Sequence, residues 1–327
     1  MAIEPVRTVA IVGASGRIGG AFAEALLQTG KHTVTALIRK GSNGTVPEGV
    51  NKVVVDYDDE SSVVEALKGQ QFLIITLSFN APPDLHSKIV AAAGKAQVPY
   101  IMPNYYSYPL HSVTDDSDFY AKLSFERLQD VPRNSFSAQV NMACGFWYEW
   151  SLALGEEWFG FDIARRKVTI IDDGKRTITA TTWNQCGRAV AALLSLPQKS
   201  SGSSSRSLAD FIGDKGLLIE SFHVSQRDML DSLHRVLGTT DSDWDIVHES
   251  SDKRRKDGTE ALQRNDVRGF AKLLFANVFD VSNPVSNYVG EANLTLNLPK
   301  EDLDEATRRA IDMVNNEYRS SVNLDLP

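Results

Sequence analysis

Three glycines are the residues of this chain whose spacing points most directly to a chemistry. Gly13, Gly16 and Gly19 form a G-x-x-G-x-x-G pattern after the apolar run 9–12. Glycine at these positions allows a tight strand-to-helix turn, a close backbone approach to a pyrophosphate, and close packing of the helix on the strand. The pattern predicts a dinucleotide-binding turn, because the helix N-terminus also attracts phosphates. Further cofactor contacts expected in this turn are Ser15, Arg17 and Ile18.

Two basic residues follow the next apolar run, which spans residues 34–38. Arg39 and Lys40 stand where an NAD-binding unit places an acidic residue on the ribose 2′-hydroxyl. Two cations at this position suit a 2′-phosphate instead, so the sequence predicts NADPH as the cofactor. A basic pair on a solvated loop is the alternative interpretation.

Alternating strands and helices must position these residues. The apolar runs 52–55, 72–77 and 99–102 alternate with the helical patterns 61–69 and 85–96. This alternation predicts an α/β fold with a doubly wound parallel sheet (Rossmann), followed by a smaller C-terminal α+β substrate-binding domain. Loops at the carboxyl ends of parallel strands line the ligand crevice. The cofactor contacts expected at strand ends are therefore Asp56, Ser78 and Phe79.

Several of these motifs occur in the order of a known family. They are GASGRIGG (13–20), the Arg39-Lys40 pair, DYDD (56–59), SSVVEALKG (61–69) and PYIMPN (99–104). The chain resembles the NmrA-like and isoflavone reductase-like branch of the atypical short-chain dehydrogenases/reductases (atypical SDR), and it is most similar to fungal isoflavone reductase homologues of the CipA type. The resemblance is densest up to about Trp150.

The resemblance also implies a catalytic lysine. No tyrosine in the sequence has a lysine four residues later, which excludes the Tyr-x-x-x-Lys pair of ordinary short-chain dehydrogenases. Residues 119–128 resemble the helix that carries the single lysine of isoflavone reductase-like enzymes, and this places Lys122 at the catalytic position and beside the cofactor. An ammonium there can stabilise negative charge on the substrate as hydride arrives. The alternative is an exposed helix lysine, and Ser124 and Phe125 depart from the family pattern.

The loop after the strand 99–102 departs from the family as well. The family commonly has Pro-Ser-Glu-Phe-Gly, and this chain has Pro-Asn-Tyr-Tyr-Ser at 103–107. We expect Asn104 and Tyr105 to take part in catalysis, and Tyr106 and His111 to contact the substrate. The resemblance also implies that Asn104 contacts the cofactor, and so does Asn141, which ends a run (138–141) similar to the family's sixth strand. His86, near the start of a helix, is expected to be structural.

Aromatic residues gather after residues 138–141. Phe146, Trp147 and Trp150 belong to a group much denser in rings than the 9% average of the chain. Rings at this point suit a flat aromatic or polyketide-derived substrate, although core packing is the alternative. We expect these three residues to bind the substrate.

Residues 1–155 are expected to form the NAD(P)-binding domain. Residues 156–327 are expected to form mainly a substrate-binding or lid domain, with the segments 176–196 and 217–224 returning to the Rossmann sheet. Residues 167–172 and 176–181 resemble a hairpin across Asp173-Gly174. The charged residues 252–257 are interpreted as a solvated face.

Composition narrows the functional class. The 327 residues carry 34 Lys+Arg against 42 Asp+Glu, a net charge of −8, so nucleic acid is not an expected partner. Cys144 and Cys186 lack metal-ligand spacing, and we expect no metal. No signal peptide and no apolar run of membrane-spanning length is recognisable, so no membrane association and a cytoplasmic location are expected.

These observations predict an NADPH-dependent reductase of secondary metabolism. Hydride would pass to a C=C or C=O group of an aromatic or polyketide-derived small molecule. One alternative is a non-catalytic NADP(H)-sensing regulator of the NmrA type, which binds a partner protein. Another is a quinone or azo-type reductase that needs no proton-donating residue. The sequence leaves the substrate and the oligomeric state open.

Overall fold

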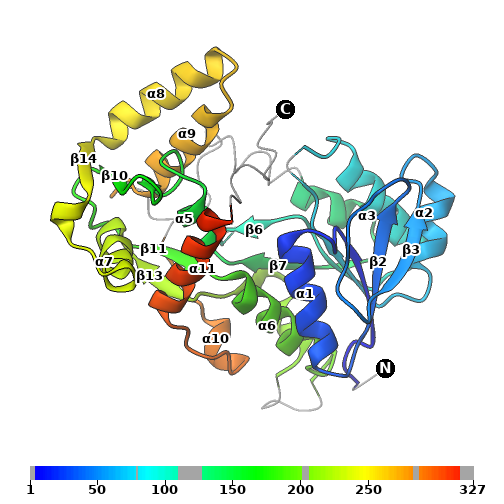
Figure 1. Cartoon of the computed structure of the whole chain (residues 1–327). Helices are drawn as coiled ribbons and strands as arrows, with labels where there is room; N and C mark the ends of the chain where they lie inside the picture. The colour runs from blue at the N-terminus through cyan, green and yellow to red at the C-terminus, as the bar shows by residue number, and fades with distance from the viewer. Residues whose placement is uncertain (1–3, 79, 110–126, 201–205, 283–286, 317–327) are drawn as a thin grey trace. The chain divides into compact units, whose positions relative to one another are not determined.

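The computed structural model describes residues 4–78, 80–109, 127–200, 206–282 and 287–316. The chain divides into two compact units. The first unit comprises Met1–Ala143, Trp183–Ile219 and Gly290–Leu298, and the second comprises Cys144–Thr182, Glu220–Val289 and Pro299–Pro327. Figure 1 shows both units.

An eight-stranded sheet forms the centre of the first unit. Its strand order is β12-β7-β5-β4-β1-β2-β3, with β6 paired to β7, and the pairings are parallel. The strands are β1 (Thr8–Val12), β2 (Thr33–Arg39), β3 (Asn51–Val55), β4 (Phe72–Ile75), β5 (Tyr100–Met102), β6 (Tyr106–Ser107), β7 (Ala138–Ala143) and β12 (Gly213–Leu218). The order 3-2-1-4-5 and its continuation are those of a Rossmann fold, which confirms the predicted fold class.

Helices cover both faces of this sheet (Figure 1). They are α1 (Arg17–Gln28), α2 (Glu60–Leu67), α3 (Leu85–Lys95) and α6 (Trp183–Leu194), with the short elements η2 (Leu208–Phe211) and α10 (Ala292–Thr295). Alternate strand residues such as Ala10 and Val12 enter a buried cluster with Leu67 of α2 and Ile89 of α3. The near-continuous apolar strands thus reflect burial on both faces, as expected for a parallel sheet.

Two small sheets and a set of helices form the second unit. One sheet has the order β14-β10-β9 and the other β13-β11-β8. The strands are β8 (Phe146–Trp147), β9 (Phe161–Asp162), β10 (Lys167–Ile171), β11 (Ile178–Thr181), β13 (Phe222–Val224) and β14 (Asp245–Glu249). The helices are α5 (Tyr148–Ala153), α7 (Gln226–Leu237), η3 (Asp241–Asp243), α8 (Ser251–Gln263), α9 (Arg268–Val278) and α11 (Leu303–Asn315).

The two units differ in their limits from the expected domains. The first segment of the first unit ends at Ala143, whereas the sequence placed the domain boundary at residue 155. Of the segments expected to return to the parallel sheet, α6 and β12 belong to the first unit, but β11 and β13 belong to the second. The predicted hairpin is wrong because β10 and β11 join different sheets. Its turn exists, with Gly174 at φ +69°, but each strand finds its partners elsewhere.

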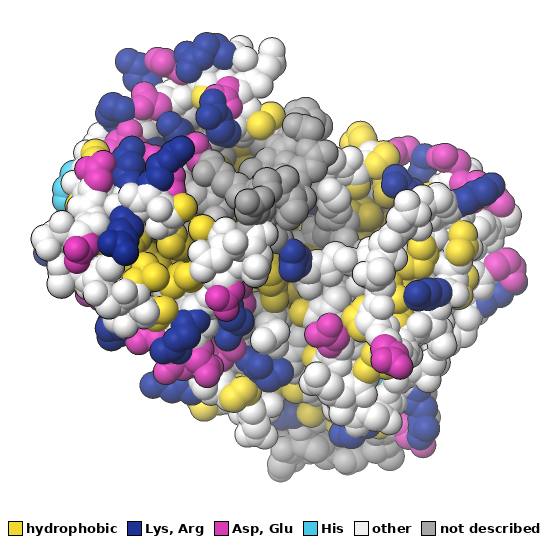
Figure 2. All heavy atoms as spheres, in the orientation of Figure 1, with side chains coloured by type: hydrophobic (Ala, Val, Ile, Leu, Met, Phe, Trp, Pro, Cys, Tyr) yellow, Lys and Arg dark blue, Asp and Glu magenta, His cyan; other side chains and the backbone are white. Residues whose placement is uncertain are grey.

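Charged side chains of both signs are mixed on the molecular surface shown in Figure 2. On this face, basic and acidic residues lie among one another. Within the described ranges, no helix is long and apolar enough to cross a membrane.

Helices α1 and α6 pack at a glycine, and this contact generates a stability prediction. A Cβ on Gly187 of α6 would lie 2.5 Å from the backbone oxygen of Ala21 in α1. We expect Gly187→Ala to lower the free energy of unfolding by about 1–3 kcal/mol, because the helices must move apart. Chemical denaturation monitored by circular dichroism measures this change.

A matched control lies in α1 itself. A Cβ on Gly20 would meet nothing closer than the Ala14 oxygen at 3.6 Å, which is an ordinary contact. Gly20→Ala should therefore be neutral or stabilising by up to about 1 kcal/mol through helix propensity. Equal destabilisation by the two substitutions would contradict this account of the α1–α6 contact.

Candidate functional site

Three chain segments meet at the glycine turn between β1 and α1. Gly13 has φ +83°, and a Cβ there would lie 2.0 Å from the Thr76 backbone oxygen. A Cβ on Gly19 would lie 2.3 Å from the Gly13 oxygen and 2.7 Å from Thr76 Oγ1. Thr76 Oγ1 in turn donates a hydrogen bond to the Val12 oxygen at 2.7 Å. Only glycine fits at residues 13 and 19, so the first turn of α1 lies directly on the ends of β1 and β4.

The N-terminus of α1 begins at Gly16. Its N–H donates to the Gly13 oxygen at 2.9 Å, and among the described residues no side chain caps the helix. The N–H groups of the first turn are therefore suited to binding phosphate oxygens. The side chains of Ser15 and Arg17 are exposed beside this turn, and the Arg17 guanidinium lies 5.9 Å from the centre of the Trp183 ring. Ile18 is buried and anchors the turn to the core.

Two exposed cations stand at the end of β2. Within the described ranges, the side chains of Arg39 and Lys40 make no ion pair with an acidic residue. The Lys40 backbone N–H donates to the Val55 oxygen at 2.9 Å, which fixes the pair beside the end of β3. Burial raises the pKa of the neighbouring Tyr57 to about 12, and the positive charge of Arg39 partly opposes that rise. Sequence inspection passed over Tyr57, although its place directly after a strand end was a usable signal.

Asp56 and Ser78 organise the turns that follow their strands. The Asp56 carboxylate accepts from the Asp58 N–H at 3.1 Å, and its own N–H donates to Ser62 Oγ at 3.1 Å. Ser78 is exposed, and its Oγ accepts from the Asn80 N–H at 3.3 Å. Both residues lie at the carboxyl edge of the sheet, as the sequence predicted. Their contact with a cofactor stays a prediction.

Asn104 joins the ends of β4 and β5. Its Oδ1 accepts from the Leu77 N–H at 3.2 Å, and its Nδ2 donates to the Leu77 oxygen at 3.3 Å. The side-chain amide thus binds both the N–H and the oxygen of Leu77, as the backbone of a neighbouring strand does in a sheet. The amide thereby fixes the spacing of two loops at the edge where the sheet binds its ligand.

A buried histidine contacts the same loop. His86 of α3 is 2% exposed. Its Nε2 accepts from the Asn104 N–H at 3.2 Å, and its Nδ1 lies 2.7 Å from Asp130 Oδ2. Burial lowers the pKa of His86 below its ordinary value, although Asp130 opposes this effect. The sequence predicted a structural histidine here but gave no sign of either partner, because Asp130 is 44 residues away.

Both tyrosines expected to face the substrate use their hydroxyls within the protein. Tyr105 is 3% exposed and donates to the Tyr108 oxygen at 2.6 Å. Tyr106 is 8% exposed and donates to the Ile75 oxygen at 2.9 Å, and its ring packs 5.6 Å from that of Phe22. In this arrangement both rings are buried and both hydroxyls donate to backbone oxygens. Their roles toward substrate stay predictions.

Asn141 lies beside a small pocket at the end of β7. It is buried, its Oδ1 accepts from Gln139 Nε2 at 2.8 Å, and its Nδ2 donates to the Gly213 oxygen at 3.3 Å. The pocket is lined by Tyr105, Tyr108, Pro109, Asn141, Ala143, Gly216 and Leu218. The structure thus brings Asn141 and Tyr105 together, as expected of two residues at adjacent strand ends. Three other predicted site residues, Phe79, His111 and Lys122, lie outside the described residues.

The three aromatic residues predicted to bind substrate belong to a ring cluster of the second unit. The ring centres of Trp147 and Trp150 lie 5.9 Å apart, and Phe146 packs 5.0 Å from Phe275 of α9. Trp158 joins the two groups, at 4.3 Å from Trp150 and 5.7 Å from Phe275. Phe146 is 8% exposed, and Trp147 and Trp150 are half-buried. Substrate contact by these three residues stays a prediction.

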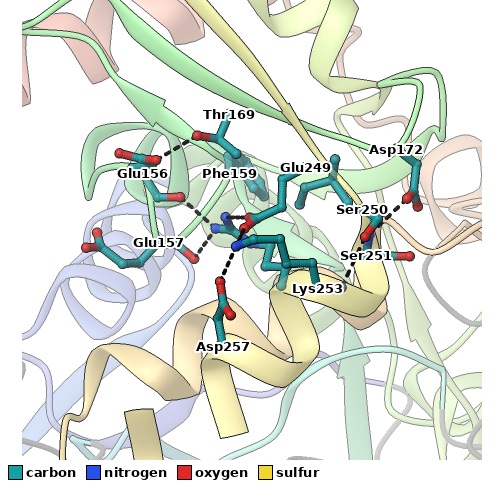
Figure 3. Close-up of polar contacts among 12 residues, drawn as sticks. Glu156, Glu157, Phe159, Thr169, Asp172, Glu249, Ser250, Ser251, Lys253 and Asp257 are labelled. Carbon is teal, nitrogen blue, oxygen red and sulfur yellow. Dashed lines mark hydrogen bonds and ion pairs between the residues drawn. The ribbon is translucent and has the colours of Figure 1, made fainter. Parts of the chain in front are cut away.

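A buried arginine holds the loop that carries Trp158. Arg254 of α8 is 1% exposed and donates from Nη2 to the backbone oxygens of Glu156 and Glu157 at 2.7 and 2.9 Å. Its Nη1 lies 3.2 Å from Glu249 Oε2. Burial lowers the pKa of Arg254, and Glu249 opposes that shift. Figure 3 shows the surrounding contacts. The interpretation of residues 252–257 as a solvated face is therefore wrong at Arg254.

Known proteins match both the sequence and the fold. A family model described as NAD(P)H-binding matches residues 13–121. Oxidoreductase aprR of Aspergillus flavus is 26% identical over 305 residues, which cover 91% of this chain and 96% of that protein. These two matches support an NAD(P)H-dependent oxidoreductase.

Solved structures extend the likeness to nearly the whole chain. An isoflavone reductase structure matches with a TM-score of 0.69 at 16% identity, covering 93% of this chain and 99% of that one. An NADPH-dependent quinone oxidoreductase from Escherichia coli matches with a TM-score of 0.66 at 17% identity and the same coverage. At these identities the likeness shows the fold, which is that of the isoflavone reductase-like proteins.

The glycine turn generates a prediction that separates binding from packing. A Cβ on Gly16 would meet only the Gly13 oxygen, at 3.2 Å, in an ordinary backbone conformation. Gly16→Ala should therefore leave the thermal midpoint within a few degrees of wild type but weaken NADPH binding, because its methyl group would add bulk at the turn where we expect the backbone to approach a phosphate. Gly19→Ala should lower the midpoint by several degrees, since its Cβ collides with the end of β1.

Thermal unfolding without cofactor and a fluorescence titration with NADPH measure the two effects separately. A Gly19→Ala protein as stable as wild type would contradict the packing seen here. Unchanged NADPH affinity in Gly16→Ala would show that phosphate does not bind at this turn.

Proposed function

We propose that this protein, an oxidoreductase with an NAD(P)H-binding domain and the isoflavone reductase-like fold, uses NADPH to reduce an aromatic or polyketide-derived small molecule. The reaction is hydride transfer to a C=C, C=O or quinone-like group. Two observations together carry the proposal. Among the described residues, no side chain caps the N-terminus of α1 at Gly16, and the exposed cations Arg39 and Lys40 lie at the end of the neighbouring strand β2.

The fit of the first unit to NADPH rests on space and charge. Gly13 and Gly19 let the first turn of α1 pack directly against Thr76 and the Gly13 oxygen, which places the helix N-terminus where it can approach a pyrophosphate. Arg39 and Lys40 suit the 2′-phosphate that distinguishes NADPH from NADH, because guanidinium and ammonium groups form charge-assisted hydrogen bonds with phosphate. When bound, the nicotinamide supplies the hydride. The chain's own residues supply binding and orientation.

An aromatic substrate agrees with the chemistry of the second unit and with the relatives. Trp147 and Trp150 are half-buried members of a ring cluster, and flat substrates stack on such rings. Proteins with this fold include an isoflavone reductase and a quinone oxidoreductase, whose names both refer to flat unsaturated substrates. A role in secondary metabolism follows from the same resemblance and forms part of the proposal.

Lys122 is the residue that we propose to act on the substrate. Its role rests on the resemblance of residues 119–128 to the catalytic helix of isoflavone reductase-like enzymes, since it lies outside the described residues. The ammonium would hydrogen-bond the substrate oxygen and stabilise its negative charge as hydride arrives. Lys122 is favoured over Tyr105 and Tyr106 because both of those hydroxyls donate to backbone oxygens.

The cofactor assignment predicts a change in specificity at Arg39. Arg39→Ala should weaken NADPH binding about tenfold to a hundredfold, the effect of removing one charge-assisted hydrogen bond, and leave NADH binding nearly unchanged. Fluorescence titration with both nucleotides measures the ratio. Lys52→Ala is the matched control, because Lys52 is an exposed cation three residues before the β3 residue paired with Arg39. An unchanged NADPH-to-NADH ratio in Arg39→Ala would overturn the assignment.

The proposed reaction predicts turnover that depends on Lys122. Wild type should oxidise NADPH in the presence of at least one member of a panel of phenolic, quinone and enone substrates. Lys122→Met should lower kcat by about a hundredfold or more and leave the Kd for NADPH within about threefold, because only the charge at the reacting oxygen is lost. Stopped-flow absorbance at the nicotinamide band measures turnover.

Two other outcomes of this substrate panel would favour the alternative functions, a cofactor-sensing regulator or a quinone-type reductase. Tight NADP⁺ binding without turnover on any substrate would reject the enzyme and favour the NmrA-type regulator. Full turnover by Lys122→Met would reject the lysine mechanism and favour a quinone-type reductase that needs no proton donor.

A further inference from the structure

We propose that His86 and Asp130 form a positioning pair that holds Asn104 against Leu77, and so sets the shape of the ligand-binding edge of the sheet. The inference rests on the proposed function, because it takes the carboxyl ends of β4 and β5 to be part of the site that binds NADPH. It concerns residues that act through Asn104 and do not themselves touch substrate.

The hydrogen bonds fix the protonation state of His86. Nε2 accepts from the Asn104 N–H at 3.2 Å, and this requires a free lone pair on that nitrogen. The proton of the neutral ring therefore sits on Nδ1, where it is donated to Asp130 Oδ2 at 2.7 Å. The ring is 2% exposed, so water does not compete for either contact. One neutral tautomer satisfies both neighbours.

Three hydrogen bonds fix the position of Asn104, the residue that His86 contacts. The Asn104 N–H is bound by His86, and both ends of its side-chain amide are bound by the backbone of Leu77. Leu77 lies two residues beyond β4, and Asn104 two residues beyond β5. Release of the N–H frees the main chain at Asn104 to turn, and the amide then loses its alignment with Leu77.

The position of this contact gives it functional weight. Loops at the carboxyl ends of β4 and β5 line the ligand crevice of a doubly wound sheet, and Ser78 follows Leu77 directly. A displacement of about 1 Å in a positioning group costs up to about a hundredfold in rate, because reacting atoms must be held in near-attack geometry. His86 thus acts on the ligand site through the backbone.

Protonation of His86 would break the contact. A second ring proton would sit on Nε2 and face the Asn104 N–H, donor against donor. Charged groups that act on His86 are Asp130, which favours the charged ring, and Arg127, which disfavours it; Arg133 also lies 3.5 Å from Asp130. Burial is the largest effect and lowers the pKa of His86 below 6.5. The stability that the neutral ring contributes is therefore present above pH 6.5 and is lost as pH falls through the lowered pKa.

A second buried histidine provides the matched control. His32 is 8% exposed, its Nδ1 contacts the Val6 oxygen at 2.7 Å, and its Nε2 contacts Ser195 Oγ at 3.3 Å. Burial lowers its pKa as well. His32 directly precedes β2, however, so it lies at the amino edge of the sheet, away from the ligand-binding edge.

The experiment compares His86→Leu, His86→Gln and His32→Leu in NADPH affinity, kcat, KM and thermal midpoint. We expect His86→Leu and His32→Leu to lower the midpoint to a similar degree. Only His86→Leu should weaken NADPH binding or lower kcat, by about tenfold or more. His86→Gln should restore most of the loss, because its amide can accept from Asn104 and donate to Asp130.

The pH dependence of NADPH affinity separates the two roles, because a purely structural role of His86 would leave it unchanged. Wild-type NADPH affinity should fall more steeply below pH 6.5 than that of His86→Gln, since glutamine does not titrate. Titration of the 2′-phosphate near pH 6 is common to both proteins, so their difference isolates His86. Identical pH profiles, or equal kinetic losses in His86→Leu and His32→Leu, would overturn the inference.

The outcomes also separate this inference from the proposed function. A wild-type protein that does not bind NADPH contradicts the proposed function whatever the His86 variants do. Wild-type turnover with unaltered His86→Leu affinity and kinetics contradicts only the positioning pair. If His86→Leu does not fold, His86→Gln alone decides through its pH profile.

Discussion

The rest of the candidate site depends on a steric constraint, the close contact between the first turn of α1 and the ends of β1 and β4. Gly13, Gly19 and Thr76 share a space in which no additional carbon fits. The Gly13 oxygen and Thr76 contact the first turn of the helix directly. These contacts hold the N-terminus of α1 at the carboxyl edge of the sheet. This placement suits the helix N-terminus to phosphate binding, because the N–H groups of the first turn lie at the edge where the sheet binds its ligand.

Around this fixed point, side chains serve mainly to set the spacing of backbone segments. Asn104 pairs with Leu77, and the Tyr106 hydroxyl binds the Ile75 oxygen, so one loop is fastened twice to the end of β4. Such contacts let short loops keep a defined shape without regular secondary structure. Polar residues that the sequence predicts to contact cofactor or substrate thus also hold the loops at the strand ends, and their contact with a ligand stays a prediction.

The sequence predicted the parallel sheet well because its signals are local. Apolar runs, glycine turns and helix patterns lie within single βαβ units, and right-handed crossovers leave few ways to arrange them. Pairings between distant segments carry no such signal. The sequence predicts the turn at Asp173-Gly174, but the two strands beside it do not pair with each other. Strand β10 pairs with β9 and β14, and β11 pairs with β8 and β13.

Arg254 shows why charged residues are hard to place from sequence alone. It lies in a charged run on α8, and its burial is decided by the backbone oxygens of Glu156 and Glu157, which are 98 and 97 residues away. The same limit applies to the site. His86 was visible as a helix histidine, but its partners Asn104 and Asp130 come from two separate segments. A buried polar residue reveals its role only when the groups that satisfy it are known.

The hydroxyls of Tyr105 and Tyr106 both donate to backbone oxygens, and this bears on the kind of reduction that the site can support. Hydride transfer to an isolated carbonyl produces an alkoxide, which is strongly basic and needs an acid at hand. Transfer to a quinone or to a conjugated aromatic system produces a delocalised phenolate or enolate, which needs only electrostatic stabilisation and can take its proton from water. Among the described residues at the ligand edge, Tyr105 and Tyr106 donate to backbone oxygens and His86 donates to Asp130. For the proposed reductase, this arrangement of the described groups favours flat unsaturated substrates, whose delocalised products need stabilisation more than protonation.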